Sequence, residues 1–171
     1  MDNTLLFDMT YGMFCVTAMD ADKPVGCIAN SIMQVTSEPP RLAVCLNKEN
    51  YTAECINKSK KLSVSVLAEE SGGDVIRTFG FKSSKDADKF SKTEYEYIDG
   101  LPVVKENRCG YFICKVVDIF DCGTHNIYIS EIEDAKREAE IKTPMSYNFY
   151  HKVIKGKAPK KAPTYMAPDK K

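Results

Sequence analysis

The sequence predicts a mainly β protein, an antiparallel β-barrel with a few short helices. Runs rich in branched and aromatic residues recur between clusters of turn-forming residues, a pattern typical of strands. The helix-like segments are few and short, and they do not alternate with the strands, which argues against a doubly wound parallel sheet. With 171 residues the chain suits one domain that buries roughly 70% of its unfolded surface.

The first half of the chain predicts three strands and one helix. The strands cover residues 11–19, 25–34 and 41–46. The corner at 38–40 (EPP) interrupts the sheet because proline has no N–H to donate. The third strand is apolar enough for burial on both faces. A helix follows over residues 50–59, and either Asn50 or Thr52 can cap it.

The second half predicts further strands with short helical segments between them. Strands are expected over 61–67, 108–120 and 124–132, two short strands over 95–104, a helix over 74–80, and a helical turn over 85–90. Alternation in KLSVSVL predicts a half-buried strand over 61–67. In the last strand His125, Ile127 and Ile129 share one face. Residues 133–143 are ambiguous between strand and loop, and the end of the chain is proline-spaced and extended.

The charge is balanced overall but uneven along the chain. A formal net charge of zero gives no reason to expect nucleic acid or a membrane as partner. Residues 151–171 hold seven Lys against one Asp, a local charge of +6, so residues 1–150 carry −6. The basic tail suits an acidic partner or an anionic ligand. It also fits a solvated terminus, and we expect the last five residues to be frayed.

The N-terminus and the cysteines predict a cytoplasmic protein. No basic region followed by an apolar stretch marks a signal peptide, and no apolar run approaches the roughly 18–20 residues that span a bilayer. The seven cysteines are odd in number, form no CxxC pair and mostly lie within apolar, strand-like runs. We expect reduced core thiols, and neither disulfides nor a metal site.

Two polar bends are candidate anion sites. Ala29-Asn30-Ser31 ends one strand, and residues 47–52 (NKENYT) lead into the predicted helix. Backbone N–H groups at a bend, and a helix N-terminus with Lys48 beside it, both attract phosphate. Each bend alone also fits an ordinary turn or a capped helix. Because strands join the two bends, one long phosphorylated ligand could bridge them.

The two histidines leave alternatives open. His125 begins a strand after Gly-Thr, and it fits either a satisfied core or turn position or a residue that points into a ligand cleft. His151 ends an aromatic segment, 147–151, which either packs on the barrel or covers a flat ring. The chain contains no GxGxxG, P-loop, GxSxG or HExxH motif. A classical nucleotide fold, hydrolase or metalloenzyme is therefore not expected.

Several stretches resemble the flavin reductase-like family, and more narrowly the flavoprotein domain of high-molecular-weight rubredoxins and the flavoredoxins. They are YGMFCVTA, GCIANSIMQVTSEPPRLAVCLNKENYT, CGTHNIYISEI and YHKVIKGKAPKKAPTY, which together run from about residue 11 to residue 165. The resemblance implies an FMN-binding, Greek-key split β-barrel over residues 1–155, with a basic tail over 156–171. It also implies a homodimer with flavin near the subunit interface.

The resemblance also implies roles for individual residues. The cofactor-binding residues would be Ala29, Asn30, Ser31, Gln34, Val35, Thr36, Asn47, Lys48, Asn50, Tyr51 and Thr52. The first bend would contact the ribityl–phosphate part, residues 34–36 the isoalloxazine edge, and the second bend the phosphate. His125 would be the catalytic residue at the nicotinamide and flavin side. The tail with its tyrosine would reach over the flavin or the dimer partner.

The implied function is that of an FMN-dependent oxidoreductase. NADH or NADPH would give hydride to FMN, and the electrons would pass to free flavin, rubredoxin or another carrier. An alternative is a non-enzymatic flavin-binding electron carrier that a protein partner reduces. A third reading is another ligand in the same barrel, as in pyridoxamine-phosphate oxidases, and the paucity of His argues against haem. Because rubredoxins are typically acidic, the tail lysines, Lys155, Lys157, Lys160 and Lys161, are a candidate docking site.

Overall fold

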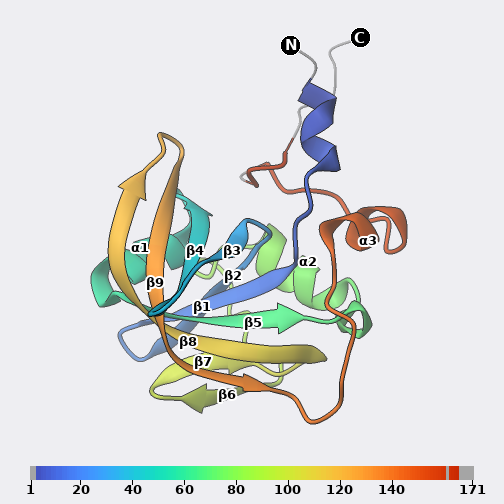
Figure 1. Ribbon diagram of the computed structural model, residues 1–171. Coiled ribbons are helices and arrows are strands. Elements are labelled where there is room, and N and C mark those ends of the chain that lie inside the picture. The colour runs from blue at the N-terminus through green and yellow to red at the C-terminus, as the bar shows by residue number, and fades with distance from the viewer. Residues whose placement is uncertain (1–2, 161, 166–171) are drawn as a thin grey trace.

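The computed structural model describes residues 3–160 and 162–165 and shows an antiparallel split β-barrel (Figure 1). The main sheet contains β1 (Phe14–Asp20), β2 (Lys23–Ala29), β3 (Ile32–Ser37), β4 (Pro40–Asn47), β5 (Lys61–Leu67), β8 (Arg108–Asp121) and β9 (His125–Arg137). Their order is β2-β1-β5-β8-β9-β4-β3, and every pair is antiparallel. The mainly β, split-barrel prediction is confirmed. The expected frayed end, residues 167–171, lies outside the described residues.

The two outermost strands of the sheet follow each other directly in the chain. β2 pairs with β1 and β3 pairs with β4, so the chain changes partners at Asn30-Ser31. Ser31 O accepts a hydrogen bond from Cys45 N at 3.0 Å, which holds the start of β3 against β4. The prediction of a single strand over 25–34 was therefore wrong. One extended segment cannot pair with two partners that lie at opposite edges of the sheet.

The helices are short and lie outside the barrel (Figure 1). They are α1 (Tyr51–Ser59), α2 (Asp74–Phe81) and α3 (Tyr147–Lys152), with 3-10 turns η1 (Asn3–Asp8) and η2 (Glu69–Ser71). Asn50 caps α1 by accepting a hydrogen bond from Thr52 N at 3.0 Å, as the sequence predicts. The segment 85–90 forms a turn and bends and no helix. α3 was not predicted, because a single aromatic turn carries no helical periodicity.

The hairpin of β6 (Tyr95–Ile98) and β7 (Leu101–Val104) covers the outer face of β1 and β5. Ser63 Oγ donates to Pro102 O at 2.7 Å, and Ser65 Oγ donates to Val104 O at 3.0 Å. Both serines are fully buried, so the prediction that 61–67 is half-buried was wrong. Serines that alternate with apolar residues are typical of a strand with one face in solvent. Here the serine hydroxyls instead donate hydrogen bonds to carbonyl groups of the covering hairpin.

The core has two main parts. Inside the barrel, buried branched residues such as Val16, Val44 and Val64 pack with Ile56 of α1 and with Tyr128. Outside it, Phe79 of α2, Met145 and Tyr147 pack against β1 and β5. The seven cysteines are free thiols; four are buried, two are half-buried, and Cys122 is exposed. Within the described ranges, none of the helices is long and apolar enough to cross a membrane.

Candidate functional site

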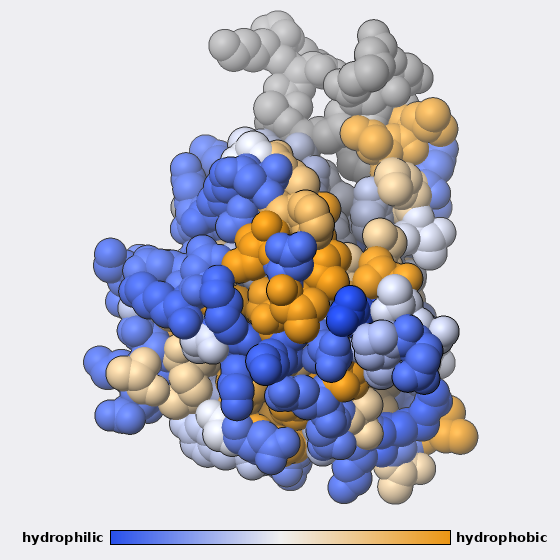
Figure 2. Space-filling model, turned by 60° about the vertical axis from the view of Figure 1, so that its left-hand side comes forward, coloured by the Kyte–Doolittle hydropathy of each residue, from blue (hydrophilic) through white to orange (hydrophobic). Residues whose placement is uncertain are grey.

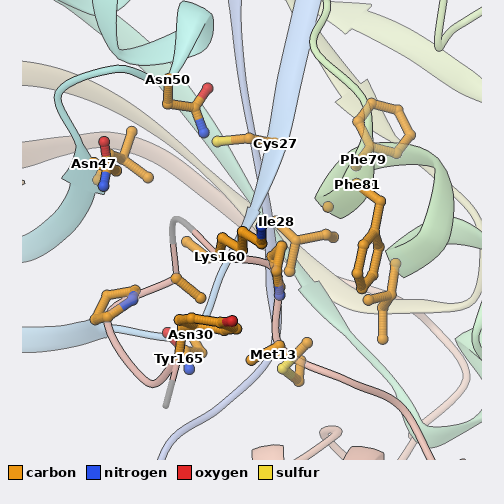
Figure 3. Close-up of a pocket in the computed structure, with 18 of the residues that line it drawn as sticks. Met13, Cys27, Ile28, Asn30, Asn47, Asn50, Phe79, Phe81, Lys160 and Tyr165 are labelled. Atoms are coloured by element: carbon orange, nitrogen blue, oxygen red, sulfur yellow. The ribbon is translucent and has the colours of Figure 1, made fainter. Parts of the chain in front are cut away.

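A cavity of about 550 Å³ lies at the barrel rim (Figure 3). Its walls come from the end of β2, the turn between β4 and α1, the C-terminal half of α2, and the C-terminal segment 157–165. This volume is within the range of roughly 300–1,000 Å³ that small-molecule and cofactor sites occupy. The cavity is therefore the candidate functional site.

The two polar bends meet in this cavity. Asn30 comes from the first bend, and Asn47 and Asn50 come from the second. Figure 3 shows Asn47 and Asn50 on one side of the cavity and Asn30 near Tyr165 on another. The bends approach because β3 starts beside β4, directly after the first bend. Of the other predicted cofactor-binding residues, Ala29 and Tyr51 also line the cavity.

The second bend is held by its own side-chain oxygens. Asn47 Oδ1 accepts from Glu49 N at 2.9 Å, and Asn50 Oδ1 accepts from Thr52 N. With these oxygens engaged, each asparagine presents its NH₂ group as the remaining polar group. Figure 3 shows the Asn50 amide nitrogen next to the Cys27 sulfur. The bend therefore offers hydrogen-bond donors to the cavity, which suits an anionic or carbonyl-bearing ligand.

The opposite wall is apolar and is fixed by a buried lysine. Ile76, Phe79 and Phe81 of α2 line the cavity. Lys89 is buried, and its ammonium donates to Gly26 O at 2.7 Å and to Phe79 O at 3.1 Å. Burial lowers the Lys89 pKa, while the nearby cysteine thiols oppose that change. Lys89 thus ties β2 to α2 and holds the aromatic wall in place.

The C-terminal segment closes one side of the cavity. Asn30 Nδ2 donates to Thr164 Oγ1 at 3.0 Å, and Thr164 Oγ1 donates to Tyr147 OH at 2.6 Å. Tyr150 OH donates to Lys157 O at 3.2 Å. The sequence predicted an extended basic tail over 156–171, and in the structure Lys157 and Thr164 of this tail contact Tyr150, Asn30 and Tyr147. Lys161 and residues 166–171 lie outside the described part of the chain.

Predicted site residues on β3 lie outside this cavity. Gln34, Val35 and Thr36 are exposed on the edge strand, and Gln34 Nε2 donates to Thr36 O at 3.2 Å. Ser31 Oγ donates to Asn30 Oδ1 at 3.2 Å and thereby orients the Asn30 amide. The predicted contact of 34–36 with the isoalloxazine edge stays a prediction.

Two predicted phosphate ligands, Lys48 and Thr52, do not line the cavity. Lys48 Nζ pairs at 2.5 Å with Oδ2 of Asp121, the last residue of β8. The hydrogen bond from Lys48 lowers the Asp121 pKa. Thr52 is fully buried in the first turn of α1. Tyr51, which does line the cavity, donates its hydroxyl hydrogen to Asp20, and this raises the Tyr51 pKa to about 12.

His125 lies one strand away from the cavity. It pairs with Asn47 in the β4–β9 register, and its Nδ1 lies 2.8 Å from Thr124 Oγ1. Its Nε2 is buried, and among the described residues it has no hydrogen-bond partner. His151 packs against Tyr147 with ring centroids 4.3 Å apart, and burial lowers its pKa. His125 thus has a free ring nitrogen, whereas His151 belongs to an aromatic cluster.

The sequence did not point to every residue that lines the cavity. Phe79 and Phe81 come from α2, and Lys82, Lys157 and Lys160 add positive charge. The helix over 74–80 was predicted, but the local sequence does not indicate which part of the protein its apolar side faces. The tail lysines were predicted as a docking site or an anion site, without a link to the two polar bends.

The fold and the cavity define a small split β-barrel protein with a rim cavity of the size typical of cofactor sites. Comparison with known families gives the same picture, because residues 6–155 match the model of the flavin reductase like domain. The chain belongs to the flavin reductase-like family.

Two curated relatives cover nearly the whole chain. The high molecular weight rubredoxin of Moorella thermoacetica is 39% identical over 96% of this chain and 72% of its own length. The ferric-chelate reductase (NAD(P)H) of Archaeoglobus fulgidus is 38% identical over 97% of this chain and 98% of its own length. The predicted resemblance to this family is therefore confirmed.

Solved structures support the fold. The NADH:FAD oxidoreductase of Streptomyces globisporus has a TM-score of 0.74 at 22% identity, covering 83% of both chains. The flavoredoxin of Methanosarcina acetivorans has a TM-score of 0.70 at 24% identity, covering 76% of this chain and 70% of its own. At these identities the likeness extends to the split barrel alone.

Proposed function

We propose that this protein is a flavin-dependent oxidoreductase that binds FMN in the rim cavity and takes electrons from NADH or NADPH. The observation that carries the proposal is the meeting of Asn30 with Asn47 and Asn50 across a cavity of about 550 Å³. Polar donors at the two bends suit the ribityl chain and phosphate. The apolar wall with Phe79 and Phe81 suits a flat aromatic ring.

The relatives support an oxidoreductase of this kind. One carries the name ferric-chelate reductase (NAD(P)H), and others are flavin reductases from Pseudomonas putida and Kitasatospora aureofaciens. A flavin held by these residues would supply the redox chemistry, a two-electron transfer from the reduced nicotinamide to a second acceptor. For that acceptor we propose rubredoxin or free flavin.

The chain's own residues bind and orient the reactants. Asn30, Asn47 and Asn50 present amide groups, and the α2 wall excludes water from one side of the cavity. His125 Nε2 is buried next to the cavity strand and has no partner among the described residues. We assign to it the orientation of the electron donor, or the stabilisation of negative charge, through a hydrogen bond from that nitrogen.

We also infer that the protein acts as a homodimer. In the strand register, Met33 and Phe120 lie on the same outer face as Ala43, Ile127 and Ile129. Met33 is 66% exposed and Phe120 54% exposed. Figure 2 shows apolar residues gathered on one side of the molecule, with hydrophilic residues around them. Patches of this kind are typical of interaction surfaces, and Cys45 on the same face also lines the cavity.

The absorbance spectrum of the purified protein tests flavin binding. We expect a yellow protein, or a colourless one that binds added FMN in a one-to-one ratio. Identification of the released flavin distinguishes FMN from FAD. A protein with no affinity for either flavin would refute the proposal.

Stopped-flow reduction tests the enzymatic part of the proposal. We expect NADH or NADPH to bleach the flavin at a rate of about 1 s⁻¹ or faster, within the ordinary range of enzymes. Very slow bleaching by both nucleotides would instead indicate an electron carrier that a protein partner reduces.

A further inference from the structure

Three exposed lysines line the cavity and have no carboxylate partner among the described residues. They are Lys82, directly after α2, and Lys157 and Lys160 of the C-terminal segment. Among the described residues none of the three forms an ion pair, whereas Lys48, Lys58, Lys105 and Lys142 all do. The cavity lining contains a single carboxylate, that of Glu49. Its charge therefore favours an anionic ligand.

The two tail lysines reach the cavity along a fixed path. Lys155 has a positive φ of 61°, and the chain then passes over the Tyr150 ring at Gly156, where an added Cβ would overlap that ring. Hydrogen bonds from Tyr150 OH to Lys157 O and from Asn30 to Thr164 fix the segment at two points. Between them, Ala162 N donates to Pro159 O at 2.9 Å and forms a turn.

Both tail lysines are thus held between anchors on the body of the protein. Figure 3 shows Lys160 among the residues that line the cavity, together with Ile28 and Asn30. A flexible tail would place its charges anywhere around the molecule. The anchors instead keep these charges close to the amide groups of the two bends.

We propose that Lys157 and Lys160, together with Lys82, bind a phosphate group of the nucleotide that occupies the cavity. The sequence assigned this role to Lys48, but Lys48 pairs with Asp121 outside the cavity. Ammonium groups form strong charge-assisted hydrogen bonds with phosphate oxygens. The inference rests on the proposed function, because both the flavin nucleotide and the nicotinamide dinucleotide carry phosphate.

The same inference changes the expected role of the tail in partner docking. Lys157 and Lys160 line the cavity and are therefore not free to bind an acidic electron carrier while they hold a phosphate. Of the four lysines proposed for docking, Lys155 remains outside the cavity lining, and Lys161 lies outside the described residues.

The test compares phosphorylated and unphosphorylated flavin. In the K157Q/K160Q variant we expect the FMN dissociation constant to rise about ten-fold or more, because two charge-assisted contacts are lost. Riboflavin lacks the phosphate, and its dissociation constant should change less than about two-fold by the same reasoning. Flavin fluorescence titration at low and high salt measures both, and the salt dependence for FMN should also weaken.

Two further variants serve as controls. K85Q/K92Q removes the same charge from exposed lysines that do not line the cavity, and it should leave FMN binding unchanged. K157R/K160R keeps the charge and should retain most of the FMN affinity. A thermal melt of each variant checks that the fold is intact.

Each outcome decides between defined alternatives. If FMN binding is unchanged but the KM for NADH or NADPH rises about ten-fold, the phosphate belongs to the dinucleotide and the site stands. If FMN and riboflavin weaken equally, or if nothing changes, the inference is overturned. Wild-type protein that binds no flavin would refute the proposed function itself, which is a different result.

Discussion

Asn50 serves the fold and the cavity with one side chain. Its Oδ1 caps α1, and its amide nitrogen lies next to Cys27 in the cavity wall. The sequence narrowed the cap to Asn50 or Thr52, because both residue types accept a hydrogen bond at a helix start, and the structure shows that Asn50 is the cap. The same amide also faces a cavity, and this second role depends on the positions of β2 and α2.

Two substitutions at Asn50 separate these roles. N50A should lower the free energy of unfolding by about 1 kcal/mol, because the cap is lost. N50D keeps an acceptor for Thr52 N and adds a negative charge at the helix N-terminus, so stability should be retained. The same charge lies in the cavity wall, and FMN affinity should fall about ten-fold or more through like-charge repulsion.

Chemical denaturation and FMN titration on the same preparations measure both effects. N50D protein that is stable and binds FMN as tightly as wild type would show that the phosphate lies away from this bend.

At the scale of helices and strands, two glycines differ in the space that is available for an added methyl group. Gly80 lies inside α2, where a Cβ would touch Ile28 at an ordinary 3.6 Å. Gly110 lies where β8 approaches β9 closely, and a Cβ there would lie 2.5 Å from Lys136 O. The predicted helix over 74–80 ends one residue too early, because α2 continues to Phe81.

G80A should raise the free energy of unfolding by about 0.5–1 kcal/mol, because alanine loses less backbone entropy in a helix than glycine. G110A should lower it by about 2 kcal/mol or more, because strand backbone cannot move aside without losing hydrogen bonds. Urea denaturation of the two variants side by side measures the difference. A neutral G110A would mean that β8 and β9 are farther apart than described.

Elements with a strong local signal were predicted well, and elements defined by their partners were not. The alternating run over 61–67, the long apolar run over 108–120 and the predicted helix over 50–59 gave β5, β8 and α1 to within one residue. The break between β2 and β3 was missed, because pairing with opposite edges of the sheet leaves little trace in the residues themselves. β9 also runs on to Arg137, through charged residues that β8 pairs with.

On the scale of the whole molecule, the exposed apolar face of β3, β4, β8 and β9 is the feature that most needs a partner. Isolated apolar residues on a surface are ordinary, but here register places several on one face. The cavity adjoins this face through Cys45 and Asn47, so a second copy would help to close it.

F120K places a charge on this face and should convert the dimer to a monomer, because an unpaired buried charge costs several kcal/mol. I141K is the matched control, since Ile141 is 83% exposed and lies in the loop after β9. Sedimentation or light scattering gives the mass of each. A wild-type monomer, or a dimeric F120K, would contradict the proposed interface.

The sequence by itself determined the β-rich architecture, the cap of α1 and the two polar bends, because short-range backbone and side-chain preferences specify them. The tertiary structure decided which other residues line the cavity together with the two bends. It paired Lys48 with Asp121, brought the segment with Lys157 and Lys160 to the cavity, and covered the serines of β5 with a hairpin. Side chains that are distant in sequence come into contact only when the strands pair. Which strands pair depends on the burial of apolar residues across the whole barrel.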